Sequence, residues 1–242
     1  MTQGKLCRLH RKTRRFLESF KIKVKMVQCA HTIFHNVLFM TWIVVGLGNP
    51  GFEYEGTRHN TGAMALETFR KAQEFPEWRL DTKRKALISE GKIEPLGKKS
   101  GKAEKALLVF PQTFMNKSGD SIRGLIKSKK EAERLVVIHD DLDIPFGSYK
   151  ISFNKSSGGH RGVESIIKAI KTESFVRVRI GIASSASVVK KSQDDKTVEK
   201  IILGTFTPDQ MSTLRKMSKQ IAEGLVVLIT EGRDKAMSQY HS

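Results

Sequence analysis

The feature that most constrains the fold is an alternation of short apolar runs with segments of helical spacing. Trp42–Gly48 is apolar and ends in glycines, which is typical of a buried strand entering a tight loop. Thr61–Gln73 follows with apolar residues spaced as on one helix face. Further strands are expected at 86–93, 106–110, 135–138, 148–153 and 176–182, and helices at 118–130, 163–171 and within 208–232. The pattern predicts an α/β fold with a twisted, mixed and mostly parallel sheet flanked by helices.

Composition limits the class of protein. The 242 residues are 39% hydrophobic and 28% charged, which favours a soluble globular domain and excludes wholesale disorder. Two cysteines are too few for a disulfide-rich secreted scaffold or a four-cysteine zinc module. An uncharged apolar run of membrane-spanning length is missing, so we expect no membrane partner. We therefore expect one globular domain over residues 41–242.

The net charge of +18 favours a polyanionic partner such as nucleic acid. Basic residues are densest in residues 1–40, which we interpret as a basic N-terminal extension. Such a composition is typical of an organelle-targeting peptide. A disordered basic arm and a true start at Met40 remain alternatives. The expected location is accordingly mitochondrial or cytoplasmic.

Four loops after the predicted strands carry most of the chemically active side chains. They are 49–60, 111–118, 139–145 and 156–162, and each combines glycine or proline with amide, imidazole or carboxylate groups. Ligands of open α/β sheets bind beyond the carboxyl ends of the strands. We therefore expect the four loops to meet at one site.

The first loop also matches the glycine spacing of a dinucleotide-binding fingerprint, Gly46–Gly51. In that motif a helix opens at once, so that its N-terminus meets the pyrophosphate. Here Pro50 and Gly51 delay the expected helix, so a dinucleotide enzyme is a weak alternative.

Four ordered motifs carry a closer resemblance. They are Ile43–Asn60, Pro111–Gly119, Val137–Gly147, and Gly158–Gly162 together with Arg177–Gly181. In order and spacing they resemble the signatures of bacterial-type peptidyl-tRNA hydrolases, over roughly residues 42–240. The resemblance implies hydrolysis of the ester between a peptide and the 3′-terminal ribose of tRNA, without cofactor or metal. It also implies a monomer whose partner is the peptidyl-tRNA substrate, with no obligate protein partner. A non-catalytic RNA-binding relative on the same fold is the alternative.

The resemblance assigns catalytic roles to three residues. His59 matches the general base that takes a proton from water. Asp140 matches the carboxylate that orients this imidazole and stabilises its protonated form. Asn49 matches the amide that helps to distinguish N-blocked from free aminoacyl-tRNA.

Four further residues match substrate-binding positions. Tyr54 and Phe114 match aromatic side chains that line the site, and Asn116 matches an amide near the base. Arg161 stands where the family normally has asparagine. Arginine only donates hydrogen bonds and adds charge, yet we expect activity to be retained.

Basic residues of the third and fourth motifs are weaker candidates. Lys150, Arg177 and Arg179 match a region that binds tRNA phosphates, with a merely solvated face as the alternative. His139 and His160 are expected to be structural. An acidic Mg²⁺ cluster at 140–143 and a metal site at 29–35 are both disfavoured, because the former suits turn formation and the latter lacks a fourth ligand.

Overall fold

The described residues form one seven-stranded sheet in the order β2-β3-β4-β1-β5-β7-β6. The computed structural model describes residues 41–97, 102–183 and 195–240; the expected extension at 1–40 lies outside them. The strands are β1 (Thr41–Gly46), β2 (Arg79–Asp81), β3 (Ala86–Ile93), β4 (Glu104–Pro111), β5 (Leu135–Pro145), β6 (Tyr149–Phe153) and β7 (Val176–Ala183).

Parallel pairing is confined to the four central strands, β4, β1, β5 and β7. The outer strands β2, β3 and β6 pair antiparallel. Apart from Thr41, β1 and the first four residues of β5 are apolar because both of their faces are covered, as is usual in parallel sheets. The expected mixed sheet is confirmed.

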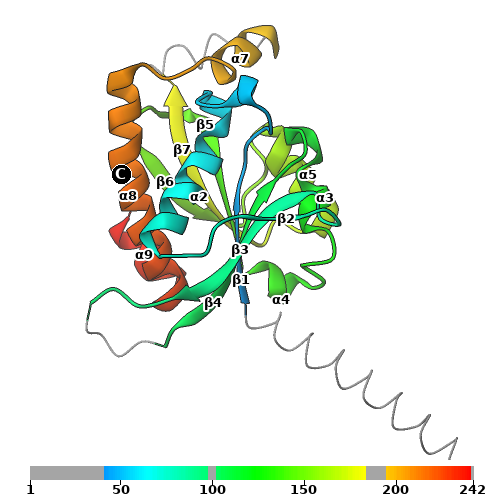
Figure 1. Ribbon diagram of the computed structural model, residues 1–242, viewed down its shortest axis with the longest axis vertical. Coiled ribbons are helices and arrows are strands. Elements are labelled where there is room, and N and C mark those ends of the chain that lie inside the picture. Colours follow the sequence, from blue (N-terminus) through cyan, green and yellow to red (C-terminus); the bar gives the residue numbers. More distant parts are fainter. Residues whose placement is uncertain (1–40, 98–101, 184–194, 241–242) are drawn as a thin grey trace, which may run out of the picture. The chain divides into compact units, whose positions relative to one another are not determined.

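Helices cover both faces of the sheet (Figure 1). One face carries α2 (Thr61–Ala72) and the long α8 (Pro208–Thr230), against which α9 (Arg233–Gln239) packs. The other carries α3 (Gly119–Ile122) and α5 (Arg161–Ile170). Two more helices are α4 (Lys129–Ala132) and α7 (Asp195–Ile202), and single turns are η1 (Phe52–Tyr54), η2 (Arg58–Asn60) and η3 (Met115–Lys117). None of the helices in the described ranges combines the length and apolarity needed to cross a membrane.

Several elements differ from the sequence prediction, and β2 and α9 were not predicted at all. The helix expected at 118–130 is two short helices, because Gly124 adopts a φ of 80° that ends the first. The loop expected at 139–145 is instead the second half of β5, which stays paired with β7. The helix α7 was not among the elements predicted from the sequence.

A close contact between α2 and the sheet sets the position of the site. A Cβ on Gly62 would lie 2.3 Å from the backbone oxygen of Ile138, so only glycine lets α2 approach β5 this closely. The turn η2 leads directly into α2. The residue at position 62 therefore determines how near His59 comes to the middle of β5.

Candidate active site

A cavity of about 680 Å³ lies at the end of the sheet where the four polar segments meet. All seven residues assigned to catalysis and substrate binding line it, namely Asn49, Tyr54, His59, Phe114, Asn116, Asp140 and Arg161. These residues come from η1, η2, η3, β5 and α5 and the loop after β1. The expectation that the four segments converge is confirmed by this geometry.

The three basic residues assigned to tRNA phosphates lie apart from the cavity lining. Arg177 is only 3% exposed and its Nε has no hydrogen-bond partner among the described residues. Arg179 is paired with Asp141 at 2.7 Å. Lys150 alone of the three is exposed.

An imidazole and a carboxylate form the centre of the site. Nδ1 of His59 lies 3.0 Å from both carboxylate oxygens of Asp140, and both side chains are buried. His59 comes from η2 at the start of α2, whereas Asp140 comes from β5, 81 residues later. The contact thus depends on the packing of α2 against the sheet.

A second imidazole contacts the same carboxylate. Nε2 of His160 lies 3.0 Å from Oδ1 of Asp140. Its Nδ1 caps α5 by accepting hydrogen bonds from the backbone N–H groups of Gly162 and Val163, at 3.1 and 3.3 Å. Because Nδ1 accepts, Nε2 must carry the proton and donate it to Asp140. His160 therefore serves the site as well as the helix.

The charge on Asp140 is stabilised by these two rings. Burial alone would raise the pKa of Asp140, but the adjacent His59 and His160 outweigh it and lower the pKa below its ordinary value. The carboxylate is ionised at neutral pH and accepts from both imidazoles. Nδ1 of His59 is then the donor, and Nε2 of the same ring keeps its lone pair for a ligand.

The orientation of the Asn49 amide follows from a similar argument. The backbone N–H of Met115 donates to Oδ1 of Asn49 at 2.8 Å, so Oδ1 and Nδ2 cannot be exchanged. Asn60 holds the backbone of Asn49 through bonds of 2.8 and 3.0 Å. Within the described parts of the chain Nδ2 has no acceptor, so Asn49 offers N–H donors to the cavity.

Other residues fix the turn that carries His59. The guanidinium of Arg58 lies 4.7 Å from the ring centre of Phe206 and donates to Oε1 of Gln210 at 3.0 Å. Sequence reasoning did not single out Arg58 or Asn60 by function. The only available signal was their place in the first motif, beside His59.

Aromatic and aliphatic side chains form the apolar wall. Tyr54 and Phe114 meet edge to face, with ring centres 6.4 Å apart, and Phe114 is 57% exposed. Val198 and Ile202 of α7 line the cavity as well. The contribution of α7 was not predicted.

The group His59, Asp140 and His160 is also the one cluster of metal-capable side chains in the described ranges. Its ligand atoms lie within 4.8 Å of one another, but the contacts form a complete set of imidazole-to-carboxylate hydrogen bonds. A zinc site would call for a further protein ligand or water. Asp141 is engaged elsewhere, because it accepts from the backbone of Asp143 at 2.9 Å and pairs with Arg179.

Comparison with known proteins places this geometry in a family. The family model for peptidyl-tRNA hydrolase matches residues 43–242. The peptidyl-tRNA hydrolase of Carboxydothermus hydrogenoformans is 39% identical over 203 residues, 83% of this chain and 98% of that protein. That of Thermodesulfovibrio yellowstonii is 35% identical over 212 residues, 82% of this chain and 98% of that protein.

The fold agrees with the sequence matches. A crystal structure of peptidyl-tRNA hydrolase from Acinetobacter baumannii superposes with a TM-score of 0.70 at 28% identity, covering 84% of this chain and 95% of that one. The family match spans the cavity and all of the sheet except the first two residues of β1, and the relatives are matched over nearly their full length. The chain is therefore a member of the peptidyl-tRNA hydrolase family.

Proposed function

We propose that this protein hydrolyses the ester between a peptide and the 3′-terminal ribose of tRNA, with His59 as general base. The observation that carries the proposal is the His59–Asp140 pair, at 3.0 Å, at the wall of a cavity of about 680 Å³. The family to which the chain belongs supports the ester and the tRNA. The residue roles rest on the geometry.

The reaction needs no nucleophile from the protein. Nε2 of His59 takes a proton from water while the water oxygen forms a bond to the ester carbon. Asp140 stabilises the resulting imidazolium and keeps the ring in place. When the ester bond breaks, the ribose oxygen leaves and takes the proton from Nε2, which regenerates the neutral imidazole. The products are free tRNA and a peptide carboxylic acid, which then loses its remaining proton to solvent as a carboxylate.

Asn49 supports selection of N-blocked substrates. Its Nδ2 can donate to a peptide carbonyl oxygen, because its Oδ1 is already held by Met115. A free α-ammonium group is itself a donor and a cation, so the Nδ2 donors of this amide cannot hold it. Desolvating such a group without a partner is costly, and peptidyl-tRNA is preferred over aminoacyl-tRNA.

The remaining lining residues suit the two ends of the substrate. Tyr54 and Phe114 offer faces and edges for the terminal ribose or base. Asn116 and Arg161 are both exposed at the cavity, and both can donate to substrate carbonyl or phosphate oxygens. Lys150 is the favoured phosphate contact of the basic set, since Arg177 is buried and Arg179 is paired.

Residues 1–40 lie outside the described residues, and their role is a separate proposal. Their basic, acid-poor composition supports a targeting extension ahead of a catalytic domain at 41–242, and hence a mitochondrial protein. Mass spectrometry of the mature N-terminus tests it. An N-terminus near residue 40 in mitochondria supports targeting, whereas translation from Met40 supports a cytoplasmic enzyme.

The base assignment predicts the behaviour of two variants. His59→Ala is expected to lower kcat/KM for N-acetyl-aminoacyl-tRNA by about 10²- to 10⁴-fold, because general base catalysis is lost. Asp140→Asn is expected to lose activity as well, because an amide cannot stabilise the imidazolium. The measurement is the release of free tRNA. Lys216→Gln, on the exposed face of α8, is the control for effects of expression and purification.

Two results would count against the proposal. If His59→Ala cleaves the substrate at the wild-type rate and melts at the same temperature as the wild type, His59 is not the general base. A wild type that binds tRNA tightly without releasing it from the ester supports the non-catalytic alternative.

A further inference from the structure

The turn that carries His59 is tied to the segment that follows α7. The backbone N–H of Arg58, one residue before His59, donates to the backbone oxygen of Gly204 at 2.9 Å. Beside it, Thr57 and Thr205 form an isolated antiparallel bridge. The chain that leaves α7 therefore pairs directly with the backbone of the catalytic turn.

The side chain of Arg58 extends this tie to two further elements. Its Nη2 donates to Oε1 of Gln210, in the first turn of α8, at 3.0 Å. Its Nη1 donates to the backbone oxygen of Ile182, near the end of β7, at 3.4 Å. Its Cζ lies 4.7 Å from the ring centre of Phe206. One guanidinium thus joins the catalytic turn to β7, to α8 and to the segment 204–206.

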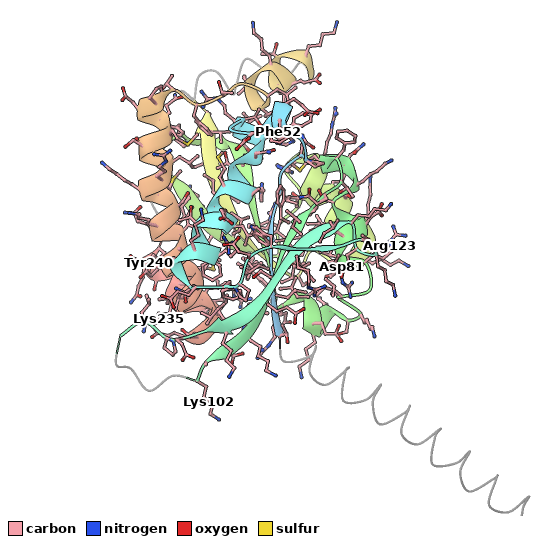
Figure 2. All side chains as sticks on the ribbon, viewed as in Figure 1. Phe52, Asp81, Lys102, Arg123, Lys235 and Tyr240 are labelled. Carbon is pink, nitrogen blue, oxygen red and sulfur yellow. The ribbon has the colours of Figure 1, made fainter. Side chains whose placement is uncertain are left out.

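Arg58 lies outside the place where the substrate binds. It is absent from the lining of the cavity of about 680 Å³, whereas His59 lines it. Val198 and Ile202 form the part of the lining that we call the α7 wall. The helix α7 lies at the same end of the sheet as Phe52 of the turn η1 (Figure 2). Arg58 can therefore influence the reaction only through other residues.

We propose that Arg58 is a positioning residue that fixes His59 relative to the α7 wall. The proposal rests on the proposed function, because it needs His59 to be the general base. Oγ1 of Thr61, the first residue of α2, donates to the backbone oxygen of Arg58 at 2.6 Å, so both backbone groups of Arg58 are held. Asp140 orients the ring of His59, and Arg58 sets the backbone from which that ring extends.

The contacts of Arg58 allow positioning to be separated from stabilisation of the fold. Within the described ranges its guanidinium contacts neutral groups, namely an amide oxygen, a backbone oxygen and an aromatic ring. Removing the guanidinium therefore leaves no carboxylate unpaired, which limits the loss of stability.

Arg134 provides a matched control. It is half-buried like Arg58 and lies 5.6 Å from the ring centre of Trp42, but it also pairs with Glu104 at 3.2 Å. It directly precedes β5, so it lies at the end of the sheet opposite the cavity. Its removal tests the loss of a half-buried arginine without any change near His59.

The first test is Arg58→Met, assayed as release of free tRNA from N-acetyl-aminoacyl-tRNA by the full-length protein. We expect kcat to fall by about tenfold to 10²-fold, because a shift of about 1 Å in a catalytic group has effects of this size. KM should stay within about twofold of wild type, since Arg58 is not in the cavity lining. Arg58→Lys keeps a cation and a donor and should recover part of kcat. Arg134→Met should leave kcat unchanged.

The decisive comparison is made in the His59→Ala background. If Arg58 acts through the base, Arg58→Met causes no further loss there, and the losses of the two single variants do not add. A further loss in that background would show that Arg58 acts on something other than the base, and would overturn the proposal. Wild-type kcat in Arg58→Met, or an equal loss in Arg134→Met, would do the same.

Phe206→Leu keeps the proposal testable if Arg58→Met does not fold. It removes the ring beside the guanidinium and leaves the hydrogen bonds of Arg58 in place. We expect kcat to fall by about twofold to fivefold, the range that one cation–π contact supplies, and the loss should vanish in the His59→Ala background. A loss that persists there would overturn the proposal. Failure of the proposed function looks different, because His59→Ala alone would then cleave at the wild-type rate, and the inference would fall with it.

Discussion

His59 and His160 contact the same carboxylate through different ring nitrogens, and the difference decides their roles. His160 gives Nδ1 to the first turn of α5 and donates from Nε2, so neither nitrogen remains for a substrate. His59 donates from Nδ1, which leaves Nε2 available. One ring is thus a positioning group, and the other can accept a proton.

A third imidazole, that of His139, lies beside His160 and predicts a pH effect on stability. His139 is fully buried and Nδ1 donates to the backbone oxygen of Asp140 at 2.7 Å. Burial, followed by the neighbouring His160, lowers the pKa of His139 well below its ordinary value. Below about pH 6.5 the unfolded chain binds a proton at this residue that the folded chain does not. The free energy of unfolding therefore falls as the pH is lowered.

His139→Asn keeps a donor for the carbonyl but removes the titration. Between about pH 6.5 and the lower folded-state pKa, the wild type should lose up to about 1.4 kcal/mol of unfolding free energy per pH unit more than the variant. Denaturant titrations at several pH values provide the comparison. Parallel curves for the two proteins would contradict a neutral, buried His139.

Arg161 predicts a modest effect on the reaction itself. It is exposed at the cavity, and the hydrogen bonds described for His59 and Asp140 come from other groups. Arg161→Asn should therefore keep kcat/KM for N-acetyl-aminoacyl-tRNA within about tenfold of wild type, equivalent to about 1.4 kcal/mol. A fall to the background rate would mean that Arg161 acts on the reacting atoms.

At this scale the sequence predicted the residue types of the cavity but not their hydrogen bonds. His59, Asp140 and Asn49 follow from ordered motifs, and the structure brings them together. The dual contact of His160 could not be predicted, because it needs both the start of α5 and the middle of β5. The amide orientation of Asn49 likewise depends on a backbone group 66 residues away.

Among the elements, α2 has the strictest steric requirement. Gly62→Ala would place a methyl group against the backbone of Ile138 and Leu47, which cannot yield without moving α2. We expect a loss of about 1–3 kcal/mol in unfolding free energy together with a fall in kcat/KM, because His59 moves with the helix.

The matched control for that change is Gly224→Ala in α8. There the nearest atoms, at 3.1 Å, belong to the side chain of Tyr240, which can shift, and alanine favours the helix. Thermal melts and tRNA release are measured on both variants. Equal effects of the two substitutions would argue against a special contact at Gly62.

The order and type of most elements could be read from hydrophobic periodicity, whereas several boundaries could not. Apolar runs such as Leu135–Ile138 identify a strand but not its end, because β5 continues through polar residues that pair with β7. The break at Gly124 was hidden within a helical pattern. The apolar residues of α7 are few, and two of them, Val198 and Ile202, line the cavity.

For the molecule as a whole, charge predicts the dependence on salt. A net charge of +18 and a polyanionic substrate imply release of counterions on binding. We expect kcat/KM to fall steeply with salt for full tRNA and less for a short acylated oligonucleotide ending in the same ribose. Lys150→Gln should reduce the log–log slope by about one if that lysine contacts a phosphate. An unchanged slope would exclude the contact.

His160 both caps α5 and donates to Asp140, so the stability of the active site depends on the N-terminus of that helix. If the opening turn of α5 frays, its capping ring is released and Asp140 loses one of its two donors, although the buried sheet is untouched. Helix ends loosen long before interior strands do. The acid–base chemistry is therefore only as heat-resistant as that single turn.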